Sequence, residues 1–379
     1  MFSPPCLGDE EALEVLAALR SGWISTGPRA KQFEAEFNNR FASPAALALN
    51  SCTAGLHTAL ITLGIGPGDE VVTTPLTFAS SVNVIEHVGA RPVLAEVDPE
   101  TLTLSPTAVE AAITARTRAV LVVHYAGHPA DLDGIRSAIG RRDIAIVEDA
   151  AHALSARYKG QFVGSRDNLA AFSFYATKNI TTGEGGMLTG DPALLDRARV
   201  LSLHGLSGDA WQRYGRGGSW YYEVQEPGFK YNMSDLQAAL GLAQLRKLDR
   251  FQARRRQVVA AYSNAFQQDP ALEVPVARRE VEHAWQLYVL RLRPETLRIG
   301  RDRFIEELAQ RKIGTSVHFI PIHLHPYYRN KYSYRPGDYP VTYESFGRML
   351  SLPLHPGLSD QDVADVIEAV LDIAREFRR

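Results

Sequence analysis

Residues 144–152 read Ile-Ala-Ile-Val-Glu-Asp-Ala-Ala-His, and this stretch decides the fold. An apolar run ends in adjacent carboxylates, which is typical of a buried strand that stops at the edge of its sheet. Upstream, Ala119–His124 is another nearly all-apolar segment, and Asp131–Ile139 between the two predicts a helix. Strands that are apolar on both faces and alternate with helices predict a parallel or mostly parallel sheet, covered on both sides.

The same alternation extends toward the N-terminus. We expect further strands at Ala46–Leu49, Glu70–Thr74 and Arg91–Glu96, and helices at Ala79–Val88 and Pro106–Thr114. Ligands of such sheets bind at the carboxyl ends of the strands. Because Asp149 falls at one of these ends, the sequence predicts a functional site there.

The chain changes character after Gly190. A helix is expected at Asp191–Leu203, and a longer one at Ser234–Phe266, where Ser234 and Gln237 fit a capping box. Between them, residues 204–228 predict a long loop, and its aromatic residues favour a functional reading.

The C-terminal part alternates short strands with helices. These elements are expected at Gln286–Leu292, Arg301–Arg311, Thr315–Phe319 and Ser359–Phe377. The sequence therefore predicts an α/β protein with a large domain over residues 1–250 and a smaller α+β domain over residues 251–379.

Bulk composition excludes several classes of protein. A chain of 379 residues with 45% hydrophobic and 22% charged residues is ordinary for a soluble globular protein. A net charge of -2 argues against sequence-independent nucleic-acid binding, which needs a basic surface. No apolar stretch approaches a membrane span or a signal peptide, and two cysteines do not form a disulfide framework. We therefore expect a cytoplasmic protein that binds neither nucleic acid nor membrane.

Lys178 is the first candidate for chemistry. It follows an apolar strand and precedes the flexible stretch Thr181-Thr-Gly-Glu-Gly-Gly. A lysine amine that loses its proton beside a carbonyl attacks it to form an imine. On position alone, a solvated surface lysine is the better explanation of Lys178, since most lysines are exposed.

Asp149 is the second candidate. A carboxylate at the end of an apolar strand needs a cationic partner, and a protonated pyridine nitrogen is one. A Mg²⁺ site beside a phosphate loop is disfavoured because the chain has no G-x-x-x-x-G-K-[ST] motif, and we expect no metal. A helix cap for the following segment is the remaining alternative.

Two further segments could complete a cofactor site. Asn50-Ser-Cys-Thr-Ala-Gly-Leu-His57 joins a strand to a helix, and helix N-termini bind phosphate, although an ordinary cap looks the same. Phe78 could stack on a flat heterocycle, although a core phenylalanine is commoner. Together the segments supply a phosphate cup, a stacking ring, an acid and an amine at successive strand ends.

With these motifs the chain resembles the DegT family of sugar aminotransferases, within the fold type I enzymes that use pyridoxal 5'-phosphate. The matching stretches cover nearly the whole chain. They are Ser21-Gly-Trp-Ile-Ser-Thr-Gly-Pro28, Asn50-Ser-Cys-Thr-Ala-Gly55, Glu148-Asp-Ala-Ala-His152, Phe172-Ser-Phe-Tyr-Ala-Thr-Lys178, Gly183-Glu-Gly-Gly186, Gly228-Phe-Lys-Tyr-Asn-Met-Ser-Asp-Leu-Gln-Ala-Ala-Leu-Gly241 and Ser351-Leu-Pro-Leu-His-Pro356. The resemblance implies a mostly parallel seven-stranded sheet between helices, followed by the smaller domain.

The resemblance also implies roles at matching positions. Lys178 would form the internal aldimine and shuttle protons, and Asp149 would pair with the pyridine nitrogen. The other cofactor contacts implied are Thr53, Ala54, Phe78, His152, Ser173 and Asn232. Asn232 would come from the second subunit of a homodimer with shared sites, although some relatives carry this asparagine where the chain has Lys230. The substrate contacts implied are Trp23, Thr26, Trp220, Tyr221 and His323.

The implied reaction is transamination through a pyridoxamine 5'-phosphate form of the cofactor. An amino acid, expected to be L-glutamate, would give its amino group to a keto-sugar carried by a nucleotide and leave as 2-oxoglutarate. A keto-cyclitol is an alternative acceptor, and a regulator that binds the cofactor without turnover is an alternative of another class. Because some relatives that dehydrate sugars replace the lysine with histidine, Lys178 favours transamination.

Overall fold

The computed structural model describes residues 3–166, 168–206 and 221–379. Its centre is a seven-stranded sheet in the order β1-β9-β8-β5-β4-β2-β3. The strands are β1 (Ala46–Leu49), β2 (Glu70–Thr73), β3 (Arg91–Leu94), β4 (Thr117–Val123), β5 (Ala145–Asp149), β8 (Leu169–Ser173) and β9 (Gly186–Thr189). Strand β9 pairs antiparallel with both β1 and β8, whereas the pairs β2–β3, β2–β4, β4–β5 and β5–β8 are parallel. The mostly parallel sheet predicted from the sequence is thereby confirmed.

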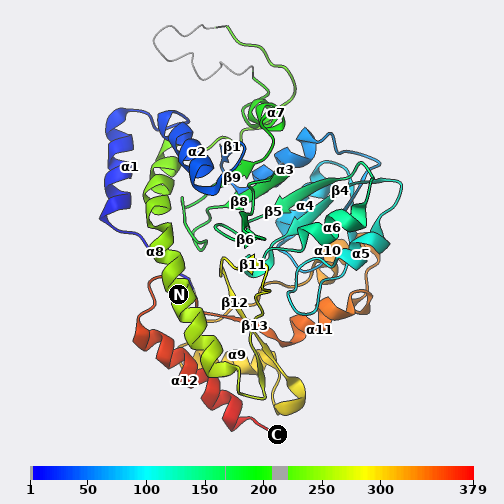
Figure 1. Cartoon of the computed structure of the whole chain (residues 1–379), viewed down its shortest axis with the longest axis vertical. Coiled ribbons are helices and arrows are strands. Elements are labelled where there is room, and N and C mark those ends of the chain that lie inside the picture. Colours follow the sequence, from blue (N-terminus) through cyan, green and yellow to red (C-terminus); the bar gives the residue numbers. More distant parts are fainter. Residues whose placement is uncertain (1–2, 167, 207–220) are drawn as a thin grey trace.

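Helices cover both faces of this sheet (Figure 1). They are α2 (Pro28–Phe41), α3 (Cys52–Thr62), α4 (Ala79–His87), α5 (Pro106–Ala112), α6 (Leu132–Ile139), α7 (Pro192–Ser202) and α8 (Asp235–Phe266), while α1 (Asp9–Ser21) packs on α8. Helix α2 turns Phe33, Phe37 and Phe41 toward the sheet, because residues four apart share one face of a helix. Phe37 lies 5.2 Å from the Phe172 ring of β8, which fixes α2 against the sheet.

The C-terminal part builds a second, smaller layer. Its sheet has the order β10-β12-β13, formed by β10 (Leu272–Glu273), β12 (Tyr288–Leu292) and β13 (Met349–Leu352). Its helices are α9 (Arg301–Gln310), α10 (Pro326–Tyr332), α11 (Pro340–Arg348) and α12 (Asp360–Glu376). A third small sheet joins the two parts through β6 (Arg157–Tyr158), β7 (Gln161–Phe162) and β11 (Val281–Glu282).

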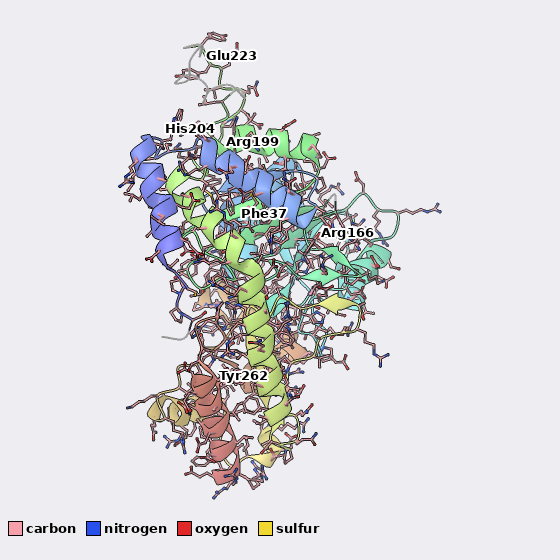
Figure 2. All side chains as sticks on the ribbon, turned by 60° about the vertical axis from the view of Figure 1, so that its left-hand side comes forward. Phe37, Arg166, Arg199, His204, Glu223 and Tyr262 are labelled. Carbon is pink, nitrogen blue, oxygen red and sulfur yellow. The ribbon has the colours of Figure 1, made fainter. Side chains whose placement is uncertain are left out.

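Helix α8 runs along both parts of the molecule (Figure 1). Ser234 caps it through the capping box with Gln237 that the sequence predicted. Its first half packs into the same core as Phe37, and its second half, around Tyr262, packs into the core of the C-terminal part (Figure 2). The change of core between Phe251 and Val258 supports the proposed domain division near residue 250.

One expected strand is absent from the described structure. Of the segment 315–319, only Ser316 pairs, in an isolated bridge with Ser351 of β13. The alternation of Thr315, Val317 and Phe319 fits a strand locally, but the chain leaves the sheet edge after one bridge. This departure carries His318 and Phe319 toward the carboxyl edge of the central sheet.

Candidate active site

The strand ends of the central sheet converge on a cavity of about 500 Å³. Ser51 and Thr53 follow β1, Thr77 and Phe78 follow β2, Asp149 ends β5, and Ser173 and Lys178 lie at and beyond the end of β8. All of these residues line the cavity. The parallel order of β2, β4, β5 and β8 brings them together because the carboxyl ends of parallel strands share one edge.

Asp149 lies on the cavity floor with 5% of its surface exposed. The Ser81 hydroxyl donates to its Oδ2 at 2.7 Å, and the backbone N–H of Ala151 donates to Oδ1 at 3.1 Å. Among the described residues no salt bridge reaches this carboxylate. The helix-cap alternative is wrong, since the residues that follow form turns rather than a helix. A buried carboxylate without an ion-pair partner favours a cationic ligand group.

Lys178 lies beyond β8 and is half-buried in the cavity wall. Burial lowers the pKa of its amine to about 8, and the negative charge of Asp149 offsets part of that fall. A solvated surface lysine keeps its proton throughout the neutral range. The amine of Lys178 therefore sits where a lysine can act as a nucleophile and as a base.

Helix α3 points its N-terminus into the cavity. Ser51 caps the helix, its Oγ accepting the N–H of Ala54 at 3.0 Å, while Ser51, Cys52 and Thr53 line the cavity. Ala54 itself is buried and does not line it, so the contact expected of Ala54 is not supported. The positive end of the α3 dipole suits a phosphate.

Gly186 shows why the chain carries glycines beside this turn. A Cβ at Gly186 would lie 2.4 Å from the backbone carbon of Ser51. Only glycine allows β9 to approach the start of α3 so closely. The glycine at position 186 thus lets β9 pack directly against the start of α3.

An aromatic group forms one wall of the cavity. The Phe319 ring lies 5.7 Å from Phe78 and stacks on His152 at 5.8 Å. Burial, with the nearby charge of Lys178, lowers the pKa of His152 well below its usual range, so the imidazole is neutral. Phe78 is 61% exposed and reaches the cavity mouth, where a flat ligand could lie against it.

The C-terminal part supplies cavity residues that the sequence reasoning missed. Gln286, His318 and Phe319 line the cavity, and burial lowers the pKa of His318 to about 4. His323, which the sequence led us to expect at the substrate, is fully buried, packs against Tyr339 at 5.0 Å and does not line the cavity. The sequence alone gave no reason to choose His318 over His323, which lies five residues later.

Other expected contacts lie away from this cavity. Thr26 and Asn232 are hydrogen-bonded to each other and line a separate depression of about 250 Å³. Trp23 and Tyr221 are exposed and line neither space. Trp220 lies outside the described residues.

The residues present fit pyridoxal phosphate. The buried carboxylate of Asp149 can pair with the ring nitrogen, and the N-terminus of α3 can bind the phosphate. The Lys178 amine, with its lowered pKa, lies in the same cavity. The fold and this site define a fold type I enzyme that uses pyridoxal phosphate.

Comparisons with known proteins agree. The DegT/DnrJ/EryC1/StrS aminotransferase family matches residues 5–371. The "Spore coat polysaccharide biosynthesis protein SpsC" of Bacillus subtilis (strain 168) is 51% identical over 376 residues, which are 99% of this chain and 97% of that protein. The putative sugar aminotransferase Spr1654 of Streptococcus pneumoniae, in its PMP form, superposes with a TM-score of 0.93 at 35% identity, covering 99% of both chains. DesV of S. venezuelae, in complex with a ketimine intermediate, superposes with a TM-score of 0.87 at 36% identity, covering 97% of this chain and 94% of that one.

The chain belongs to the DegT/DnrJ/EryC1/StrS aminotransferase family. It is a sugar aminotransferase that depends on pyridoxal phosphate, since solved structures similar to it include both PLP and PMP forms. This result sets aside the alternative of a regulator without turnover. Within the described residues, no helix is both long and apolar enough to cross a membrane.

Proposed function

We propose that the protein transfers the amino group of L-glutamate to a keto-sugar carried by a nucleotide. The observation that carries the proposal is the cavity, which joins Lys178 and Asp149 to an exposed aromatic rim at Phe78 and Tyr175. The similarity to a protein named for spore coat polysaccharide biosynthesis supports a sugar acceptor that serves a polysaccharide.

Each residue has a proposed task. When bound, pyridoxal phosphate withdraws electrons from the carbon that carries the amino group. Asp149 pairs with the ring nitrogen, and Thr53 and Ser173 bind the phosphate at the N-terminus of α3. Lys178 Nζ removes the proton from the carbon of the amino donor and later delivers a proton to the carbon that receives the amino group. Its lowered pKa makes both transfers possible near neutral pH.

The size of the cavity bears on the substrate. A volume of about 500 Å³ is within the range of small-molecule and cofactor sites. We propose that the cofactor and the sugar ring occupy this space and that the nucleotide lies outside it. We place the nucleotide over the exposed rim, where aromatic rings such as Tyr175 offer a surface for a base.

We also propose that two subunits share their active sites. Thr26 and Asn232 lie outside the cavity of their own chain, which supports a role for them at the cofactor of a second copy. Trp23 and Tyr221 are proposed to contact the substrate in the same way, and a substrate contact of Trp220 stays a prediction from the sequence. Mixing the inactive variants Lys178→Ala and Asn232→Ala tests this arrangement. Activity regained on mixing supports shared sites, and a mixture as inactive as its parts contradicts them.

The substrate is tested by direct assay with L-glutamate. The enzyme is offered a nucleotide-linked keto-sugar, the same sugar without its nucleotide, and a keto-cyclitol, and the amine product is measured by mass spectrometry. We expect the highest kcat/KM for the nucleotide-linked sugar. A preference for the cyclitol or for the free sugar would overturn the proposal. The cytoplasmic location stays a prediction, to be tested by fractionation of the source cells.

A further inference from the structure

Two hydroxyl groups, those of Thr77 just before helix α4 and of Ser81 within it, form a hydrogen-bonded chain to Asp149. Ser81 Oγ lies 2.7 Å from Asp149 Oδ2, and Thr77 Oγ1 lies 2.7 Å from Ser81 Oγ. Ser81 is fully buried and Thr77 is 2% exposed, so water does not compete for these hydrogen bonds.

The direction of the hydrogen bonds follows from the chemistry of the groups. An ionised carboxylate only accepts, so Ser81 must donate its hydroxyl proton to Asp149. The Ser81 oxygen is then left as the acceptor, and Thr77 donates to it. Both hydroxyl protons, of Thr77 and of Ser81, therefore point toward the carboxylate of Asp149.

The other oxygen of Asp149 has a different environment. The Ala151 N–H donates to Oδ1 at 3.1 Å, while the Cys52 thiol lies 3.9 Å from Oδ1 and 3.3 Å from the Ala171 carbonyl. Burial and the charge of Asp149 raise the pKa of the Cys52 thiol well above its usual range, so it stays neutral. Ser81 is thus the one side-chain hydroxyl that bonds Asp149 among the described residues.

We propose that Ser81, oriented by Thr77, is a positioning residue that keeps the proton on the cofactor ring nitrogen rather than on Asp149. A buried carboxylate facing a pyridinium can take its proton, which leaves both groups neutral and weakens electron withdrawal by the ring. Hydrogen bonds to the charged carboxylate oppose that transfer. The inference rests on the proposed pairing of Asp149 with the ring nitrogen.

The test is ¹⁵N solid-state NMR of the holoenzyme loaded with pyridoxal phosphate labelled at the ring nitrogen. We expect the Ser81→Ala variant to move the signal from the protonated toward the unprotonated position. Single-turnover reaction with L-glutamate should slow by about 10- to 100-fold, the equivalent of one hydrogen bond to a charged group. Ser80→Ala is the matched control. Ser80 also carries a hydroxyl on α4 and lines the cavity, and its loss should leave the nitrogen signal in place.

Asp149→Ala distinguishes the role of Ser81 from that of Asp149. If Asp149→Ala moves the nitrogen signal and folded Ser81→Ala does not, the role of Ser81 is overturned while that of Asp149 stands. If neither variant moves it, both are overturned. Should Ser81→Ala fail to fold, as judged by circular dichroism, Ser81→Cys replaces it. A thiol of similar size donates more weakly, so a shift of the same sign supports the proposal and an unchanged signal overturns it.

Discussion

The amine of Lys178 should react with the aldehyde of pyridoxal phosphate much faster at pH 7 than an ordinary lysine does. With a pKa of about 8, roughly a tenth of the amines are free at pH 7. A lysine at the ordinary value of 10.5 would have roughly one free amine in three thousand. Burial in the cavity wall thus makes the nucleophile roughly 300-fold more abundant, the ratio of the two fractions.

The assay follows the visible absorbance that appears when the apoprotein meets pyridoxal phosphate, in stopped flow between pH 7 and pH 10. We expect the capture rate to rise with pH and to level off above about pH 8. His152 and His318 do not confuse the profile because burial keeps both rings neutral throughout this range.

A variant tests the physical cause. Asp149 carries the negative charge that raises the pKa of Lys178 against the effect of burial, since the Cys52 thiol is neutral in this range. In Asp149→Asn the capture rate should therefore level off at a lower pH than in the unaltered protein. A rate that still rises past pH 10 in the unaltered protein would refute the reasoning, because Lys178 would then titrate like an exposed lysine.

Three further predictions concern stability, each measured by urea unfolding. Phe37→Ala empties the aromatic core behind β8 and should cost about 4 kcal/mol. Asp235→Ala should cost about 2 kcal/mol, because the Asp235 carboxylate accepts backbone N–H groups of Gly27, Arg29 and Ala30 at the start of α2. His124→Ala should cost about 2 kcal/mol, since it removes the hydrogen bond from His124 Nε2 to the buried Glu148 carboxylate and leaves that carboxylate with its contact from Asn168. Losses under 1 kcal/mol would contradict each estimate.

The central sheet could be predicted because its signal is local. Strands β2, β4 and β5 are apolar on both faces, and turn and helix signals separate them. Helix α1 gave no such signal, since it exposes Leu13 and Leu19 and buries Glu11. Packing on α8 determines which residues of α1 are buried, and the spacing of apolar residues in the sequence does not reveal this.

The site was predictable only in part, for a related reason. Asp149 and Lys178 stand at strand ends, and their order along the chain places them at one edge of the sheet. His318 and Phe319 reach the same cavity from the C-terminal part, and Ser81 contacts Asp149 from inside α4. Their positions depend on tertiary packing, so neither spacing nor residue type could single them out.

The measurement that tests the account most directly is an absorbance scan of the purified holoenzyme before and after addition of L-glutamate, with Lys178→Ala as control. The account predicts a visible band that collapses into the ultraviolet when the amino group is transferred, and no such conversion in the variant. A visible band that neither L-glutamate nor any other amino acid changes, or a variant that converts as fast as the unaltered enzyme, would contradict it.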